Sequence, residues 1–383
     1  MNDKPSSRPL LGASLAHALH DGYTDLLYVL LPVWQSEFHL SFRALAALRG
    51  IYTGAAAGLQ VPASALAERL GLRFVLVLGT LLACAGYALS GSTNHLAVLC
   101  AGLFLCGLGS STQHPVASTI VARAYGEGSR GPLGTYNFAG DLGKATLPAL
   151  TSWLISRMPW PRALRLLAML GVCVTVVFRM ILPADPTGSS RPGPVPRGMG
   201  RPGFSLLVLM GALDSGVRMG FLTFLPFLLK AKGATLEQSG LALSMLFVGG
   251  AAGKFVCGWL GQRWGFLTTV VVSEACTGGL ILAVLALPLA PVYLVLPVLG
   301  SMLNGTSSVF YGTVPDFAPT DRPDRAFALF YTATLGSGAL SPVIYGWVGD
   351  SFGATRAVAA AAAVALLLCP LAGRLSSRVT GSV

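Results

Sequence analysis

Long apolar stretches recur along the whole chain, separated by short polar or glycine-containing connections. A helix that crosses the hydrocarbon core of a bilayer needs about 20 mainly apolar residues. Twelve segments of the 383-residue chain meet this requirement: 11–33, 44–68, 72–91, 95–124, 131–157, 161–183, 203–230, 236–263, 266–289, 291–318, 324–350 and 354–375. The pattern therefore predicts an all-α membrane protein with twelve transmembrane helices.

One connection is different from the others. Residues 184–202 are rich in Pro, Gly and Arg, a composition that supports neither a helix nor a packed core. We expect a cytoplasmic linker there. It divides the chain into an N-terminal six-helix bundle, residues 1–183, and a C-terminal six-helix bundle, residues 203–383.

The two halves share an internal repeat at a fixed offset of 194 residues. The matched positions are Ala18, Leu19 and Gly22 with Ala212, Leu213 and Gly216; Pro32 with Pro226; and Leu66, Arg69 and Gly71 with Leu260, Arg263 and Gly265. Six spans separate equivalent positions, and six is even, so the repeat is parallel. Two parallel, pseudo-symmetric bundles around a central cavity are expected from such a repeat.

Composition supports the membrane assignment and narrows the partners. Hydrophobic residues make up 53% of the chain and charged residues only 11%, against roughly 25% charged in a soluble domain. The net charge of +11 is explained by loop Arg and Lys that set membrane orientation. We expect a monomeric, multi-pass protein of the cell inner membrane, in contact with membrane lipid, with both termini cytoplasmic and no nucleic acid partner.

Enzymatic and metal-binding motifs are missing from the sequence. We find no P-loop, catalytic triad or paired metal-ligand spacing, and several of the seven Cys lie inside apolar runs. The chain is therefore not expected to be an enzyme or an ATP-driven pump. We expect no catalytic residues, no cofactor and no metal site.

Two loops carry a recognisable motif. The loop after the second span contains Glu68, Arg69, Gly71 and Arg73, and the loop after the eighth contains Gln262, Arg263 and Gly265. Both resemble the major facilitator signature G-x-L-A-D-R-x-G-R-K, although Glu68 and Gln262 replace its Asp. The resemblance implies the major facilitator fold. It also implies a conformational gate at the cytoplasmic side, formed by Glu68, Arg69, Arg73, Gln262 and Arg263.

Three further stretches point to one branch of that superfamily. HALHDGY (17–23), GLGSSTQHPVAS (107–118) and LGSGALSPVIYGWVGDSFG (335–353) resemble the fosmidomycin-resistance branch, which implies drug efflux. The fifth span departs from the antiporter pattern G-x-x-x-G-P, because Leu147 stands before Pro148 where the pattern has Gly, and the charged Asp141 and Lys144 are inserted around Gly143. This departure argues against simple drug–proton antiport.

Ionisable residues inside the expected spans are the candidate chemistry, because they are costly at membrane depth unless they face a cavity or one another. Proton coupling is assigned to Asp21, Asp25, Asp141 and Asp214. Substrate binding is assigned to His20, Tyr28, His114, Lys144, Arg218, Lys254 and Tyr311.

The alternative interpretation of these residues is structural. Asp141–Lys144 and Asp214–Arg218 could be neutralised pairs, and His114 a packed histidine. We also expect Arg49 to extend toward the outer mouth. Glu274 is expected on a peripheral span.

Taken together, the residues and the resemblance predict a secondary active transporter that works by alternating access. It is expected to couple the movement of a small organic compound to the movement of protons. Export is favoured by the resemblance alone. The alternatives are proton-coupled uptake of an anionic metabolite and a transport-inactive membrane sensor.

Overall fold

The computed structural model describes residues 7–183, 203–317 and 323–380, and these residues are almost entirely helical. The predicted linker, 184–202, lies outside the described residues. The expected all-α class is confirmed. The helices of the first half are α1 (Arg8–Phe38), α2 (Phe42–Gly58), α3 (Gln60–Leu70), α4 (Leu72–Ser90), α5 (Leu96–Ser110), α6 (Ser118–Tyr125), α7 (Arg130–Ile155) and α8 (Trp160–Ile181). Those of the second half are α9 (Phe204–Ala231), α10 (Leu236–Trp264), α11 (Phe266–Ala286), α12 (Leu289–Phe317), α13 (Pro323–Phe352) and α14 (Ala354–Thr380).

A helix lies in each expected span, but two spans are interrupted. The second is split at Leu59 into α2 and α3, and the fourth is split by a π-helical turn, η1 (Gln113–Ala117), between α5 and α6. Eight helical stretches of the described chain are long and apolar enough to cross a membrane. The polar helices α1 and α7 are not among these eight, so the total of twelve spans stays a prediction.

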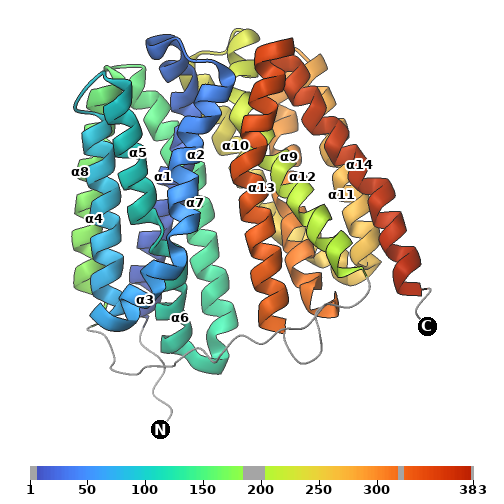
Figure 1. Cartoon of the computed structure of the whole chain (residues 1–383), viewed down its shortest axis with the longest axis horizontal. Coiled ribbons are helices and arrows are strands. Elements are labelled where there is room, and N and C mark those ends of the chain that lie inside the picture. Colours follow the sequence, from blue (N-terminus) through green and yellow to red (C-terminus); the bar gives the residue numbers. More distant parts are fainter. Residues whose placement is uncertain (1–6, 184–202, 318–322, 381–383) are drawn as a thin grey trace. The chain divides into compact units, whose positions relative to one another are not determined.

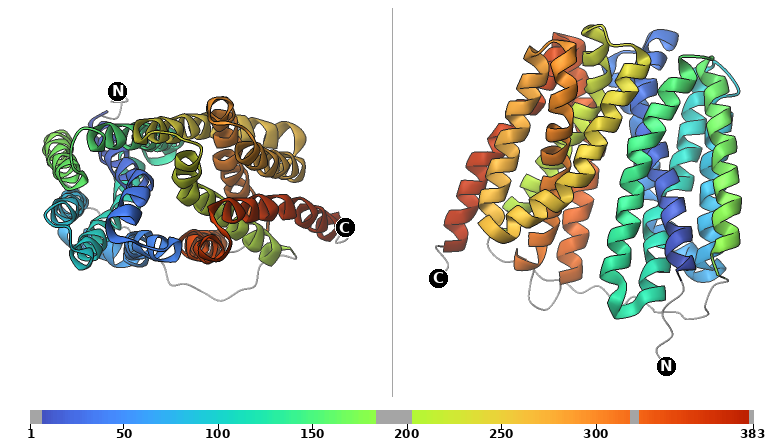
Figure 2. Two further views of the ribbon diagram at one scale, coloured as in Figure 1. Left: turned by 90° about the horizontal axis from the view of Figure 1, so that it is seen from above. Right: turned by 180° about the vertical axis from the view of Figure 1, so that it is seen from behind.

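Helix contacts divide the chain into two compact units. Unit 1 is Met1–His39 with Ala47–Arg191, and unit 2 is Leu40–Ala46 with Pro192–Val383. In unit 1, α1 packs against α7 and α8, and α4 packs against α5 and α8 (Figure 1). In unit 2, α10 packs against α12, α9 against α13 and α14, and α11 against α12 and α14 (Figure 2).

Each unit has a hydrophobic core of its own. In unit 1, Leu76 and Phe178 are fully buried in a cluster with residues of α1, α3 and η1. In unit 2, Met210, Phe330 and Leu368 are fully buried in a cluster that joins α9, α13 and α14. The helix arrangement around each polar site is therefore fixed by packing within one unit.

Glycine permits the closest helix approach in unit 1. A Cβ atom at Gly143 of α7 would collide with the backbone carbonyl of Ala18 in α1. Small residues allow helix backbones to approach in this way inside membranes. Gly143 therefore brings the charged residues of α7 within reach of those of α1.

We expect Gly143→Ala to destabilise the protein by about 1–3 kcal/mol, because backbone cannot yield as a flexible side chain can. The matched control is Gly134→Ala in the same helix, where a Cβ meets nothing within 4 Å. It should be neutral or stabilising by up to about 1 kcal/mol. Thermal unfolding of the detergent-purified variants measures both, and equal unfolding temperatures for the two would contradict this role.

Candidate functional site

The first polar cluster is built on one face of α1. His17, His20 and Asp21 are all more than nine-tenths buried. His17 lies one turn before Asp21, and its Nε2 is 3.3 Å from Asp21 Oδ1. His20 Nε2 lies 3.8 Å from the same oxygen. Residues four apart lie on the same face of a helix, which places His17 directly beside Asp21.

Lys144 of α7 supplies the cation of this cluster. Its Nζ is 3.1 Å from Asp21 Oδ2, and its side chain is 30% exposed. The sequence had suggested Asp141, three residues away on the same helix, as its structural partner, whereas the described ion pair of Lys144 reaches across to α1. Asp25 and Asp141 are buried and act on Lys144 electrostatically. Three carboxyl groups therefore surround one ammonium group.

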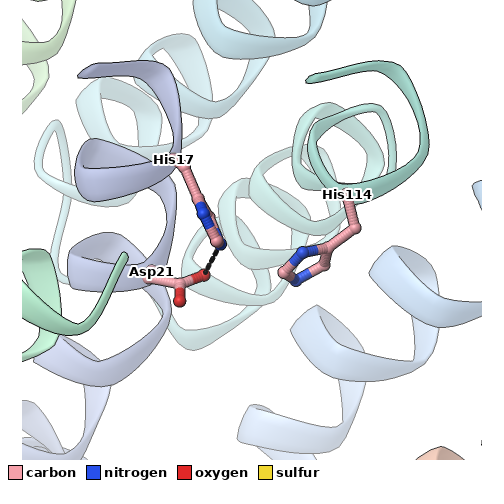
Figure 3. Close-up of side chains that lie close together, drawn as sticks. All are labelled: His17, Asp21 and His114. Atoms are coloured by element: carbon pink, nitrogen blue, oxygen red, sulfur yellow. Dashed lines mark ion pairs between the residues drawn. The ribbon is translucent and has the colours of Figure 1, made fainter. Parts of the chain in front are cut away.

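His114 comes from a third element. It lies in the π-helical turn η1, directly before Pro115, and π turns are rare and often found at functional sites. Figure 3 shows its ring directed toward His17 and Asp21. The ring centroid of His114 lies 5.3 Å from the ring centroid of His17 and 5.1 Å from that of His20. The widened π-helical turn contains Pro115 and presents the imidazole to the cluster.

The hydrogen bonds of His17 define where a proton can reside. His17 Nδ1 is 3.0 Å from the carbonyl oxygen of Tyr136, which can only accept, so Nδ1 carries the hydrogen. In a neutral ring the lone pair of Nε2 then faces Asp21 Oδ1. Nε2 is buried, and the 3.3 Å separation from Asp21 Oδ1 makes the two groups direct neighbours.

The same three groups are candidate metal ligands, and their fit can be tested. The ligand atoms of His17, Asp21 and His114 lie within 4.8 Å of one another. However, the Lys144 ammonium already occupies the second oxygen of Asp21, and a dication bound beside it would be repelled. The Lys144 ammonium group therefore disfavours a metal ion at this cluster.

Tyr28 and Arg49 form a separate buried pair in unit 1. Arg49 donates from Nη2 to Tyr28 Oη at 2.6 Å, and its guanidinium lies 4.6 Å from the ring centroid. Arg49 is only 3% exposed, so its expected extension toward the outer mouth was wrong. The tyrosine ring and hydroxyl compensate the charge inside the bundle instead.

The second cluster lies in unit 2, around a small pocket. Arg218 of α9 donates from Nη1 to Ser307 Oγ at 2.7 Å, and Ser307 donates to Asp214 Oδ2 at 3.0 Å. The proposed Asp214–Arg218 pair is thus joined through a hydroxyl of α12. Tyr311 also lines the pocket and bonds to Thr334 at 3.2 Å.

Glu274 completes this second cluster. It is 1% exposed, and its carboxyl group is close enough to that of Asp214 for the two to act on each other. The sequence pointed to Glu274 only as an acid on a peripheral span, because the interacting face of a helix depends on how it packs. Lys254, on α10, is half-buried and is not among the described residues that line the pocket.

The predicted gate residues lie at helix ends. Glu68, Arg69, Gln262 and Arg263 are exposed, and Arg263 stacks over Trp259 at 5.3 Å. Arg73 donates to the carbonyl of Arg179 at 2.6 Å. The signature glycines Gly71 and Gly265 have φ of 97° and 79°, a region that favours glycine. This conformation accounts for the glycine of the motif in both loops.

Comparisons with known proteins agree with this arrangement. The model of the Major Facilitator Superfamily matches residues 13–342 and 207–380. The Fosmidomycin resistance protein of Escherichia coli (strain K12) is 23% identical over 364 residues, which are 89% of this chain and 86% of that protein. Monocarboxylate transporter 11 of Homo sapiens is 26% identical over 313 residues, 76% of this chain and 65% of that one.

Solved structures share the fold. A bacterial homolog of the human lysosomal transporter Spinster, in an inward-facing and occupied conformation, has a TM-score of 0.77 at 15% identity and covers 98% of both chains. A mutant of the nucleoside transporter NupG has a TM-score of 0.80 at 12% identity, covering 96% of this chain and 99% of that one.

The ion pair of the first cluster can be tested by charge removal. We expect Lys144→Met to cost about 3 kcal/mol, the lower end for breaking a buried pair because the lysine is 30% exposed. The double variant Asp21→Asn, Lys144→Met should recover most of this loss. The matched double variant with Asp141→Asn should recover less. Thermal unfolding distinguishes the two, and equal recovery would contradict the assigned pairing.

Proposed function

The chain belongs to the Major Facilitator Superfamily, and on that premise we propose that it is a proton-coupled secondary transporter that exports a small organic compound by alternating access. Its relatives and structural neighbours include a monocarboxylate transporter, a nucleoside transporter and a homolog of a lysosomal transporter. The observation that carries proton coupling is the His17–Asp21–Lys144 cluster. It holds titratable groups at contact distance inside the bundle.

The proposed coupling follows from the charge balance of that cluster. When Asp21 binds a proton, Lys144 loses its closest anion and the charge distribution of unit 1 changes. A transporter shifts between facing states only if a ligand binds the two states with different affinity. A proton whose site depends on the packing of α1 against α7 meets this requirement, with Asp25 and Asp141 close to the same lysine.

Export is favoured by the name of one relative, the Fosmidomycin resistance protein. Proton-coupled uptake of an anionic metabolite is the second candidate. It is supported by the cationic Arg218 in the pocket of unit 2 and by the name of the human monocarboxylate transporter. A thermal-shift screen of the purified protein with fosmidomycin, lactate and other metabolites would separate the substrate classes.

We assign the cycling of the transporter, rather than substrate binding, to the gate residues Glu68, Arg69, Arg73, Gln262 and Arg263. They lie at or next to helix ends, and none of them is a member of either buried cluster. Their role is proposed from the signature motif.

Asp21→Asn and Asp25→Asn should each fold but lose transport driven by a pH gradient, because an amide cannot exchange a proton. The measurement is uptake of a substrate from the screen into proteoliposomes with an imposed gradient. Flux should fall to that of protein-free vesicles. Glu37→Gln, an exposed acid on the same helix, is the control and should transport normally. Unchanged gradient-driven flux in both Asp variants would remove them as proton carriers.

Arg218 should anchor an anionic group of the substrate. Its planar guanidinium suits a carboxylate or phosphonate, so Arg218→Lys should weaken binding by about 1–3 kcal/mol, and Arg218→Ala should abolish it. Titration calorimetry with the substrate measures the affinity, and Arg157→Lys, an exposed arginine, is the matched control.

The structural interpretation of Arg218 predicts a different outcome. If the residue only neutralises Asp214, the double variant Asp214→Ala, Arg218→Ala should restore stability and bind substrate normally. Near-normal affinity in that double variant would exclude Arg218 as the anchor.

A further inference from the structure

The carboxyl groups of Asp214 and Glu274 are close enough to act on each other directly. Asp214 is 4% exposed and Glu274 is 1% exposed, and Met210 and Val270, which lie one turn before the two acids, belong to the same buried cluster. Two neighbouring carboxylates repel each other, and a carboxylate has only acceptor oxygens, so the two acids can bond to each other only if one of them carries a proton.

The charge count around the pair leads to the same conclusion. Arg218 reaches Asp214 through Ser307, with hydrogen bonds of 2.7 and 3.0 Å. One guanidinium balances one carboxylate. A second ionised carboxylate would leave a net negative charge buried in the bundle, where an unpaired charge is strongly disfavoured.

The surroundings of Glu274 offer no other compensation among the described residues. The titratable groups that interact with the two acids are Arg218 on α9, Cys257 on α10, Tyr311 on α12 and Cys369 on α14. Arg218 is the cation of this set. Glu274 Oε2 is buried and has no hydrogen-bond partner, which a neutral acid tolerates better than a carboxylate.

We propose that Asp214 and Glu274 hold one proton between them, so that unit 2 contains a proton-binding site of its own beside Arg218. Its part in coupling rests on the proposed function, whereas the proton itself is a property of the purified protein. An anion that binds Arg218 takes away the charge that balances the pair. Anion and proton are therefore expected to bind cooperatively at this site, each raising the affinity for the other, which favours uptake, the second candidate function, over export.

Infrared spectroscopy of the purified protein at neutral pH tests the proposal directly, because a protonated carboxyl group has a carbonyl absorption that a carboxylate lacks. We expect Glu274→Gln and Asp214→Asn each to remove the same protonated-acid band, since the remaining acid ionises next to Arg218. Glu37→Gln, which replaces an exposed acid, should keep the band. Arg218→Gln should increase it, because both acids then need a proton.

A band that survives in both Glu274→Gln and Asp214→Asn would overturn the proposal. If Glu274→Gln does not fold, the other two variants decide. Loss of the protonated-acid band in Asp214→Asn together with a stronger band in Arg218→Gln supports the shared proton. An unchanged band in both variants overturns it. The infrared band and the substrate flux are measured in separate experiments. If the variants lose the band but the unmodified protein shows no gradient-driven transport, the proton site is supported and only the coupling is refuted. If the unmodified protein shows gradient-driven transport but the variants keep the band, the coupling is supported and the proton site is refuted.

Discussion

Buried charge in a helical bundle must be balanced within contact distance, and this constraint organises both units. In unit 1 the balance is between Asp21 on α1 and Lys144 on α7, 3.1 Å apart. In unit 2 it is between Asp214 and Arg218, joined through Ser307. Further acids act on both arrangements: Asp25 and Asp141 act on Lys144, and Glu274 acts on Asp214.

The local backbone makes these contacts possible. Gly143 lets α7 approach α1 closely enough for Lys144 to reach Asp21. The π turn at Gln113–Ala117 directs His114 toward the same cluster. A regular α-helix through Pro115 would point the imidazole in a different direction. The position of the polar side chains therefore depends on the irregular backbone as well as on the apolar packing within unit 1.

The sequence predicted the helical class, the family and most members of the two clusters, because helix periodicity and intramembrane charge are local signals. Three-dimensional partners were harder to predict. Lys144 reaches Asp21 on another helix while Asp141 also acts on it, and Arg49 is buried against Tyr28. Glu274 acts on Asp214 from a helix that was expected to be peripheral. These contacts depend on helix rotation and packing, which one sequence does not encode in any local pattern.

The central claim is that substrate flux through this chain is coupled to proton flux. The most direct measurement is the internal pH of proteoliposomes that contain the purified protein and a trapped pH-sensitive dye, with no gradient imposed at the start. Adding a substrate on one side should change the internal pH at a rate proportional to substrate flux. Substrate flux with constant internal pH would contradict the account.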